Sequence, residues 1–240
     1  MVNHLFINYA HRGASEYYPE NTLSAFYAGV EMGANGVETD IHRTKDGVLV
    51  LFHDDDIARV TNGTGQVSDY TYRQLLELDV HNAAKTRTDK ICTFQDFLKY
   101  FGDKDLVFAI ELKQDGVEKE TIDMLEACHM RERTILTSFN FESLKNAKAY
   151  APQYRVGYLY KDDEPDPVGK MRAIGGEELC PIASSLTPEL TRQFHEMGFS
   201  VRAWGIYNEE LMRHVYRCGA DGMTVNFPDK LTQYLKEQQG

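Results

Sequence analysis

The sequence predicts an α/β protein folded as a (β/α)8 TIM barrel with a small insertion after the second strand. Short β-rich runs alternate with helical patterns along nearly all of the 240 residues. The alternation gives about eight strand–helix units, the number that closes a parallel barrel. An open doubly wound sheet is the rival, but no glycine-rich phosphate-binding pattern follows the first strand. A chain of this length suits one barrel, so we expect a single domain over residues 1–240.

The first two units are followed by a segment that breaks the rhythm. Asn21 is expected to be the N-cap of the first helix and Gly33 its C-cap. From about 54 to 90 the chain is polar and contains the run "TNGTGQ", so we interpret this segment as the insertion. The elements expected in this half are a strand at 4–11, a helix at 21–33, a strand at 36–42, an extended run at 48–54 and a helical patch at 71–78.

The second half returns to regular alternation. Runs of β-branched and aromatic residues bounded by turn residues indicate strands, and apolar residues spaced three and four apart indicate helices. The expected strands lie at 105–113, 133–139, 155–160, 179–185, 200–206 and 222–227. The expected helices lie at 93–102, 116–130, 141–151, 166–175, 187–198, 208–219 and 229–238. Added to the first two strands, these strands complete a closed barrel.

The charge of the chain limits the partners that it can bind. The formal net charge is −11, from 26 basic and 37 acidic residues. Such a chain presents no general basic field to hold nucleic acid or an anionic membrane. A phosphate can still bind locally, particularly through a metal ion. We therefore expect a small-molecule partner, no nucleic acid and no stable membrane insertion.

The sequence lacks the signals of export. The run "MVNHLFINYAHRG" has no basic region followed by a long apolar stretch, and no apolar run reaches the ~18 residues that suggest a membrane span. The cysteines lie far apart and form no CxxC pair, so we expect buried thiols in a reducing compartment. These cysteines are Cys92, Cys128, Cys180 and Cys218. The expectation is a cytoplasmic protein.

Polar residues gather where strands of the predicted barrel end. Functional groups of a barrel lie at the carboxyl ends of its strands and in the loops that follow. Glu38 and Asp40 are two residues apart on one strand and therefore share a face. Glu111 and Lys113 also share a face, opposite in parity to Phe108. The polar positions at expected strand ends are His11-Arg12, Glu38 with Asp40, His53-Asp54, and Glu111 with Lys113.

These residue types together favour the cleavage of a phosphate ester. Three carboxylates at one barrel mouth would repel one another unless they were protonated or bridged by a cation. Oxygen ligands suit a hard ion, Mg²⁺ or Ca²⁺, and not zinc or copper. His11 and His53 can exchange protons near neutral pH, and Arg12 and Lys113 can hold a phosphate. A metal, two imidazoles and two cations make a site for phosphate-ester chemistry.

Each of these positions also has a purely structural interpretation. The His-Arg pair can cap a strand, the acids of the second strand can form surface salt bridges, and Glu111 can pair with Lys113. Other chemistries stay open as well, with Lys113 as the Schiff-base lysine of an aldolase or two acids as a glycosidase pair. One phosphate-ester site explains all the positions together. The aldolase leaves the three acids unexplained, and the glycosidase leaves the histidines idle.

Several motifs resemble those of the glycerophosphodiester phosphodiesterase family. They are "HRGASEYYPENT", "GANGVETDIHRTKDGVLVLFHDDDIARVTNGTG", "ELK", "TSF", "AWGIYN" and "GADGMTVNFPD". They follow the order and approximate spacing of that family from about residue 7 to 230. The resemblance implies a TIM barrel of the phosphoinositide-phospholipase-C-like type. It also implies hydrolysis of glycerophosphodiesters to an alcohol and sn-glycerol 3-phosphate with a divalent cation.

The resemblance further implies roles for single residues. His11 and His53 become the general acid/base pair, with His11 favoured as the base. Trp204 becomes a wall of the substrate pocket at the end of the seventh strand, and we expect Phe139 to bind substrate beside it. The implied ligands of one metal ion, Ca²⁺ or Mg²⁺, are Glu38, Asp40 and Glu111. The implied phosphate contacts are the positively charged catalytic residues Arg12 and Lys113.

The sequence departs from the family pattern at two places near the pocket. "GIYN" follows Trp204 where a threonine-containing form is common, and Asn226 stands where an aspartate is often found. We expect both departures to reshape the pocket without touching a core catalytic position. His42 has the parity of Asp40, and we expect it to face the mouth in a supporting role at most.

The substrate class stays open. A lysophospholipase D-type enzyme would need an apolar rim, for which Phe52, Phe139 and Trp204 are candidates. Teichoic-acid or phosphoinositide polymers are further substrates of the same machinery, but a wall polymer would require export. A non-enzymatic barrel that only binds a phosphoester would normally lose a proton-transfer residue, and both histidines are present here. The preferred alcohol, the cation and the oligomeric state, a homo-oligomer included, stay open too.

Overall fold

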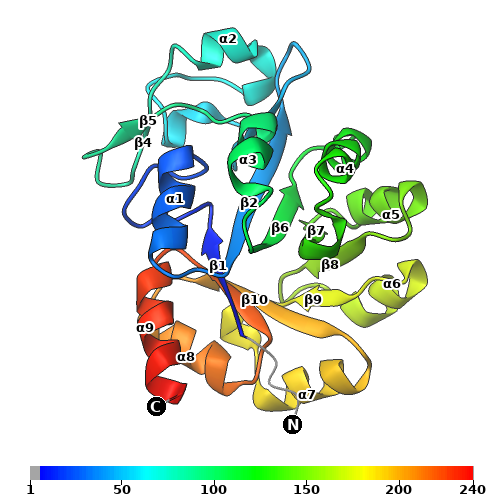
Figure 1. The fold of residues 1–240 in the computed structure, drawn as a ribbon. Helices are drawn as coiled ribbons and strands as arrows, with labels where there is room; N and C mark the ends of the chain where they lie inside the picture. Colours follow the sequence, from blue (N-terminus) through cyan, green and yellow to red (C-terminus); the bar gives the residue numbers. More distant parts are fainter. Residues whose placement is uncertain (1–5, 240) are drawn as a thin grey trace.

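The computed structural model describes residues 6–239, and within them eight parallel strands close into a barrel surrounded by helices (Figure 1). The strands follow the order β1-β11-β10-β9-β8-β7-β6-β2 around the sheet. β1 also pairs with β2, which completes the ring. The (β/α)8 barrel predicted from the alternation is therefore confirmed.

Most residues of the barrel strands are buried, because helices cover them from outside and the other strands from inside. The strands are β1 (Ile7–His11), β2 (Gly36–Arg43), β6 (Val107–Leu112), β7 (Thr134–Ser138), β8 (Arg155–Leu159), β9 (Glu178–Cys180), β10 (Ser200–Ile206) and β11 (Gly222–Val225). The first two residues of the strand expected at 4–11 lie outside the described residues.

Most of the surrounding helices start at side chains that accept a backbone N–H, as helix N-caps do. They are α1 (Leu23–Glu31), α3 (Phe94–Phe101), α4 (Glu118–Ala127), α5 (Phe141–Tyr150), α6 (Pro167–Ile174), α7 (Pro188–Glu196), α8 (Glu209–Arg217) and α9 (Pro228–Gln239). The capping residues include Thr22, Thr93, Asn140, Asp166, Thr187 and Asn208. No helix within residues 6–239 is long and apolar enough to cross a membrane.

The excursion from the barrel lies between β3 (Leu49–Leu51), which runs antiparallel to β2, and α3. Figure 1 shows it standing out beyond the ring of helices, near the top of the view. It contains η1 (Ile57–Arg59), η2 (Val67–Asp69), α2 (Tyr72–Leu75), β4 (Val80–His81) and β5 (Thr88–Asp89). Its buried side chains form a small core of their own, made of Val50, Phe52, Ile57, Val60, Val67, Leu75, Val80 and Ile91.

Side-chain parity separates the main core from the barrel mouth. On β2, Val37 belongs to the main core, whereas Glu38 and Asp40 alternate with it and converge with Glu111 of β6. On β6, Phe108 joins the same core, with the parity opposite to Glu111 that the sequence predicts. The alternation thus leaves apolar residues to hold the helices and frees the inward face for polar groups.

Two sequence-based expectations about this fold are wrong. The strand expected at 179–185 ends at Cys180, because Pro181 has no N–H to extend the ladder, and Ala183–Ser185 forms the short helix η4. The cysteines were all expected to be buried, but Cys128 is exposed. It is the C-cap of α4, where the chain leaves the packed face of the helix.

Candidate active site

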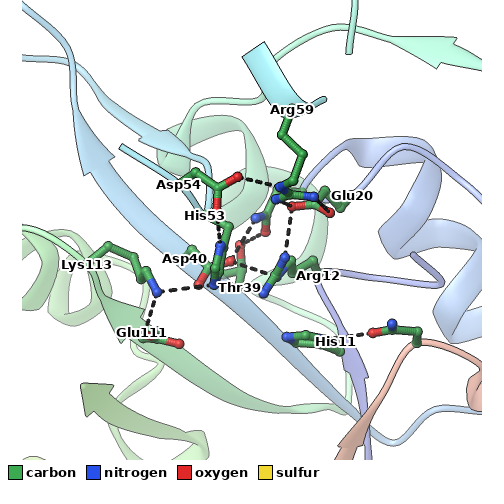
Figure 2. A network of polar contacts seen from close by, with 12 residues as sticks. His11, Arg12, Glu20, Thr39, Asp40, His53, Asp54, Arg59, Glu111 and Lys113 are labelled. Carbon is green, nitrogen blue, oxygen red and sulfur yellow. Dashed lines mark hydrogen bonds and ion pairs between the residues drawn. The ribbon is translucent and has the colours of Figure 1, made fainter. Parts of the chain in front are cut away.

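Three neighbouring strands bring the predicted acids to one end of the barrel. β1 pairs with β2 so that His11 lies opposite Glu38, and β2 pairs with β6 so that Asp40 lies opposite Glu111. The three carboxylates converge, with one oxygen of each within 4.8 Å of the others. Figure 2 shows His11, Asp40 and Glu111 on these strands.

The three acids are buried and have different proton affinities. Burial and the charges of the other two acids raise the pKa of Glu38 well above its usual range. Burial and Asp40 raise the pKa of Glu111 to about 7. Burial also acts to raise the pKa of Asp40, but the charges of Arg12, His53 and Lys113 outweigh it and hold that pKa below its ordinary value. Asp40 is therefore the permanent charge of the cluster.

The donor atoms of this cluster fit one divalent cation. All are carboxylate oxygens, which Mg²⁺ and Ca²⁺ prefer. Asp40 has no exposed area, and its Oδ1 is buried with no hydrogen-bond partner. A buried polar oxygen normally has a partner, because leaving it unpaired costs about 1–3 kcal/mol. A cation would pair this oxygen and relieve the repulsion that raises the pKa of Glu38 and Glu111.

Arg12 begins the loop after β1 and contacts two of the acids. Its backbone N–H donates to the carbonyl oxygen of Glu38 at 3.0 Å and to its carboxylate Oε2 at 3.2 Å. Its Nε lies 3.3 Å from Oδ2 of Asp40, and its Nη1 donates to Glu20 at 2.9 Å. The φ angle of Arg12 is 56°, in the left-handed region that side chains other than glycine adopt rarely. The loop therefore holds the guanidinium over the acids at a cost in backbone strain.

Gly13 allows this loop to pack against α1, and its replacement provides a stability test. A Cβ at Gly13 would lie 2.4 Å from the backbone carbonyl carbon of Ala25, whereas a Cβ at Gly47 would meet nothing within 4 Å, although both glycines have a φ near 85°. Gly47→Ala should therefore lose only the cost of the left-handed backbone, about 1–2 kcal/mol. Gly13→Ala should lose about 1–3 kcal/mol more, because backbone cannot rotate away from the clash. Urea unfolding measures both losses, and equal losses would contradict this account of the loop.

His53 follows β3 and is held at both ring nitrogens. Its Nδ1 lies 2.6 Å from Oδ1 of Asp54, and its Nε2 lies 3.3 Å from Nζ of Lys113. The lysine can only donate, so Nε2 carries the lone pair and Nδ1 carries the proton that Asp54 accepts. Burial lowers the pKa of His53, helped by the charges of Arg12 and Lys113 and opposed by Asp40 and by the bond to Asp54. His53 is consequently neutral near pH 7 with its lone pair inside the pocket.

Glu20 and Arg59 connect the two sides of the site and were not predicted from the sequence. Arg59 donates through Nε to Asp54 and through Nη1 and Nη2 to Glu20 at 2.9 and 2.6 Å, and Glu20 also accepts from Arg12 (Figure 2). Burial works against the charge of Glu20, but Arg59 and Arg12 lower its pKa to about 2. Glu20 is part of "PENT", the end of the first family motif, and this motif could have indicated a role for it. Arg59 also lies in a family motif, the run that ends in "DDDIARVTNGTG", but its position in the insertion gave no sign that it reaches the barrel mouth.

Lys113 lies just after β6 and forms an ion pair with Glu111, at 2.9 Å. Burial would lower the pKa of Lys113, but Glu111 and Asp40 outweigh it and raise that pKa. A Schiff-base lysine must lose its proton before it attacks a carbonyl. The ion pair favours the charged lysine, so the aldolase alternative finds no support in the geometry.

His11 has a partner that the sequence did not predict. Its Nδ1 lies 2.6 Å from Oδ1 of Asn226, and its Nε2 lies 3.9 Å from Oε2 of Glu38. Burial and the charge of Arg12 lower the pKa of His11 to about 3, so the ring is neutral near pH 7. The expectation that Asn226 touches no core catalytic position is therefore wrong. The two residues are 215 positions apart and meet only because β1 and β11 are neighbours in the barrel.

Asn21 has a task other than the one expected, and His42 has the expected supporting role without facing the mouth. The N-cap of α1 is Thr22, whereas Asn21 has a φ of 56° and donates through Nδ2 to Oδ2 of Asp40 at 2.8 Å. Asn21 thus orients the central acid and does not cap the helix. His42 is buried and lies 3.3 Å from the carbonyl oxygen of His53, so it supports the backbone of His53 and does not line the pocket. Gly33, the expected C-cap, follows the C-cap Met32.

A cavity of about 530 Å³ opens over these groups. His11, His53, Arg12 and Lys113 line it, and Phe139, Leu159, Trp204 and Gly205 form an apolar wall. Phe139 and Trp204 meet edge to face, with ring centroids 4.8 Å apart. Gly205 lies where the sequence departs from the threonine-containing form, so that departure falls on the wall. Phe52 is 2 % exposed in the core of the insertion, and its expected place on an apolar rim is wrong.

Comparisons with known proteins agree with this geometry. A profile of the Glycerophosphoryl diester phosphodiesterase family matches residues 11–230. A glycerophosphodiester phosphodiesterase of Caldanaerobacter subterraneus is 33% identical over 235 residues, covering 95% of this chain and 97% of that protein. A phosphodiesterase of Oleispira antarctica, solved in complex with the product sn-glycerol-3-phosphate, superposes with a TM-score of 0.82 at 26% identity and 97% coverage of each chain. A glycerophosphodiester phosphodiesterase of Thermotoga maritima gives a TM-score of 0.77 at 26% identity, covering 95% of this chain and 98% of that one.

Proposed function

The chain belongs to the glycerophosphoryl diester phosphodiesterase family, and we propose that it hydrolyses glycerophosphodiesters to sn-glycerol 3-phosphate and a free alcohol, using one divalent cation and two histidines. One observation carries the proposal: two neutral imidazoles, Arg12 and Lys113 line one cavity, together with two of the three converging buried acids. The product bound to the Oleispira antarctica phosphodiesterase supports the choice of substrate.

Glu38, Asp40 and Glu111 would hold the cation, Mg²⁺ or Ca²⁺. A divalent cation in such a site supplies a positive charge that polarises a phosphoryl oxygen and stabilises negative charge developing in the transition state. The unpaired Oδ1 of Asp40 and the raised pKa of Glu38 and Glu111 support this assignment.

Arg12 and Lys113 would bind the phosphate from two sides. Both are charged and line the cavity, and their side chains are only 14% and 16% exposed. Charge-assisted hydrogen bonds from partly buried donors are stronger than those at the surface. Their charges are already held by Asp40 and Glu111, at 3.3 and 2.9 Å, so they need not reorganise when the phosphate binds.

The histidines would move the protons of the reaction. His11 and His53 both line the cavity, and His53 has its Nε2 lone pair available. We propose His11 as the base that takes a proton from the attacking hydroxyl and His53 as the group that protonates the departing alkoxide. Because His53 is neutral at rest, its Nε2 would first take up a proton from solvent and would then give that proton to the alkoxide. Asp54, fixed by Arg59, would stabilise the imidazolium formed on His53.

Phe139 and Trp204 would contact the alcohol part of the substrate. Phe139 is 37% exposed, and Tyr207, three residues after Trp204, is 73% exposed. An exposed aromatic residue at the cavity, Phe139, and another near it in the sequence, Tyr207, favour a second candidate, hydrolysis of lysophospholipids, whose acyl chain needs an apolar surface outside the cavity. The same site would perform both reactions.

Release of glycerol 3-phosphate tests the proposal. The protein, stripped of metal, would be assayed on glycerophosphocholine, glycerophosphoethanolamine and lysophospholipids, with Mg²⁺ or Ca²⁺ added back separately. Steady turnover that stops with chelator and returns with one cation is expected. Release of lysophosphatidic acid from lysophospholipids, with no turnover of glycerophosphodiesters, would favour the second candidate. Binding without turnover of any of them would overturn the proposal.

The raised pKa of Glu111 predicts how pH affects the stability of the metal-free protein. The carboxyl group loses its proton near pH 4.5 when unfolded and at about pH 7 when folded. Between these values the folded state binds more protons, so the contribution of Glu111 to stability falls as pH rises. Glu111→Gln, which has no proton to lose, should therefore gain stability relative to the parent between pH 5 and pH 8. Urea unfolding in chelator measures this difference, and an unchanged difference at the two pH values would contradict it.

A further inference from the structure

The two histidines of the site are held by partners of different charge. Nδ1 of His53 lies 2.6 Å from a carboxylate oxygen of Asp54. Nδ1 of His11 lies 2.6 Å from the amide oxygen of Asn226. Each partner contacts Nδ1, so each leaves Nε2 as the nitrogen for chemistry.

The backbone around Asn226 is firmly fixed. Ala10 pairs with Val225 across β1 and β11, so His11 and Asn226 leave two neighbouring strands side by side. Val225 and the following Phe227 are 0% and 1% exposed. The carbonyl oxygen of Asn226 accepts the backbone N–H of Glu16 at 3.0 Å, which ties it to the loop after β1. The amide therefore meets the imidazole as part of the barrel and not as a mobile surface group.

This contact has a consequence for the position of the proton on His11. A neutral imidazole has one nitrogen that donates and one that accepts. When the amide oxygen accepts from Nδ1, the proton is on Nδ1 and the lone pair is on Nε2. Nε2 is the nitrogen closer to the acid cluster, 3.9 Å from Oε2 of Glu38. If Asn226 presented its NH₂ group instead, the proton would sit on Nε2 and His11 could not accept one there.

We propose that Asn226 is a positioning residue that fixes His11 in the Nδ1–H tautomer and directs the Nε2 lone pair toward the substrate. The inference deepens the proposed function, since it rests on His11 as the base. An asparagine suits this place because it fixes the ring without adding charge. An aspartate would also accept from Nδ1, but it would bring a fourth carboxylate to a mouth that already contains three.

Imidazole nitrogen NMR and kinetics test the proposal together. Spectra at pH 8 with Mg²⁺ present would be recorded for the parent, Asn226→Leu and Asn226→Asp, and the His11 signals would be identified by their absence in His11→Gln. Leucine fills a similar volume but accepts no hydrogen bond, whereas aspartate still accepts from Nδ1. Asn208→Leu is the matched control, since Asn208 caps α8 at the same end of the barrel and lies outside the cavity.

The parent is expected to show a protonated Nδ1 and an unprotonated Nε2. Asn226→Leu should give a mixture of tautomers and lower kcat by about 10- to 100-fold with little change in KM, as loss of an orienting partner does. Asn226→Asp should restore the Nδ1–H tautomer and most of the turnover, and Asn208→Leu should change neither. A proton on Nε2 of the parent, or an unchanged tautomer and kcat in Asn226→Leu, would overturn the proposal. A parent with the expected tautomer but no turnover would instead overturn the proposed function, because the spectra do not depend on activity.

Discussion

Alanine in place of His11 or His53 should lower kcat by about 10²–10⁴-fold, because a positioned acid or base contributes that much to a proton transfer. Both imidazoles line the cavity and are neutral near pH 7, so each can accept a proton. Steady-state release of glycerol 3-phosphate from a glycerophosphodiester measures the loss. If the two rings act in the same step, the kcat of the double variant should be only slightly lower than that of the less active single variant. The effects of residues that act as a unit are not additive.

His195→Ala is the matched control for these variants. His195 is also bonded to a carboxylate, with its Nε2 2.9 Å from Asp221, but α7 carries it to the opposite end of the barrel. This variant should keep the turnover of the parent. Rates like those of the parent in both His11→Ala and His53→Ala would refute the acid/base assignment. Retained turnover in only one of them would leave a single histidine as the proton carrier.

The sequence predicts the barrel and its acid cluster because both follow from local rules. A parallel strand shows its side chains alternately to the inside and outside, so the parity of Val37, Glu38 and Asp40 separates core from mouth without knowledge of the neighbouring strands. The rule that functional groups lie at carboxyl ends of strands then brings Glu111 to the same place. Strand boundaries were less accurate, as at Pro181, because turn and strand propensities overlap there.

The contacts between distant segments could not be predicted, because they depend on strand register and loop conformation. Asn226 meets His11 through the pairing of the last strand with the first. Asn21 was expected to be a cap, since asparagine favours N-caps, but its left-handed backbone directs the side chain to Asp40. An asparagine at a helix start can either cap the helix or orient a neighbouring side chain, and the conformation of the loop determines which of the two it does.

Arg59 illustrates a further limit. The insertion has its own small core, so its internal fold does not reveal what it does for the barrel. In the structure, η1 carries Arg59 to Asp54 and Glu20, and through them it fixes His53 and Arg12. The insertion therefore completes the site and is not merely attached to it. A guanidinium that bridges two carboxylates holds both in fixed orientation, which suits an arginine better than a lysine.

Asp40→Asn should lower kcat/KM by about 10³-fold at a fixed cation concentration, because several kcal/mol of transition-state stabilisation depend on a bound cation. Asp40 is fully buried, and its pKa is held low by Arg12, His53 and Lys113, so it carries charge when its neighbours are protonated. Asparagine has the same shape and can still accept from Asn21, but it removes that charge. The rise in Tm on addition of Mg²⁺ or Ca²⁺, which reports binding to the folded state, should largely disappear in the same variant.

Asp115→Asn separates the loss of a cation ligand from the loss of an ordinary hydrogen bond. Asp115 accepts from an asparagine amide at 2.7 Å, as Asp40 does at 2.8 Å, but it is not one of the three converging acids. It should keep both turnover and the cation-induced rise in Tm. Asp40→Asn also removes one of the two carboxylates that pair with the buried Arg12, so a fall in Tm alone would reflect folding only. The cation response therefore decides: an Asp40→Asn protein that still gains Tm with Mg²⁺ or Ca²⁺ as the parent does would refute Asp40 as a ligand, whatever its activity.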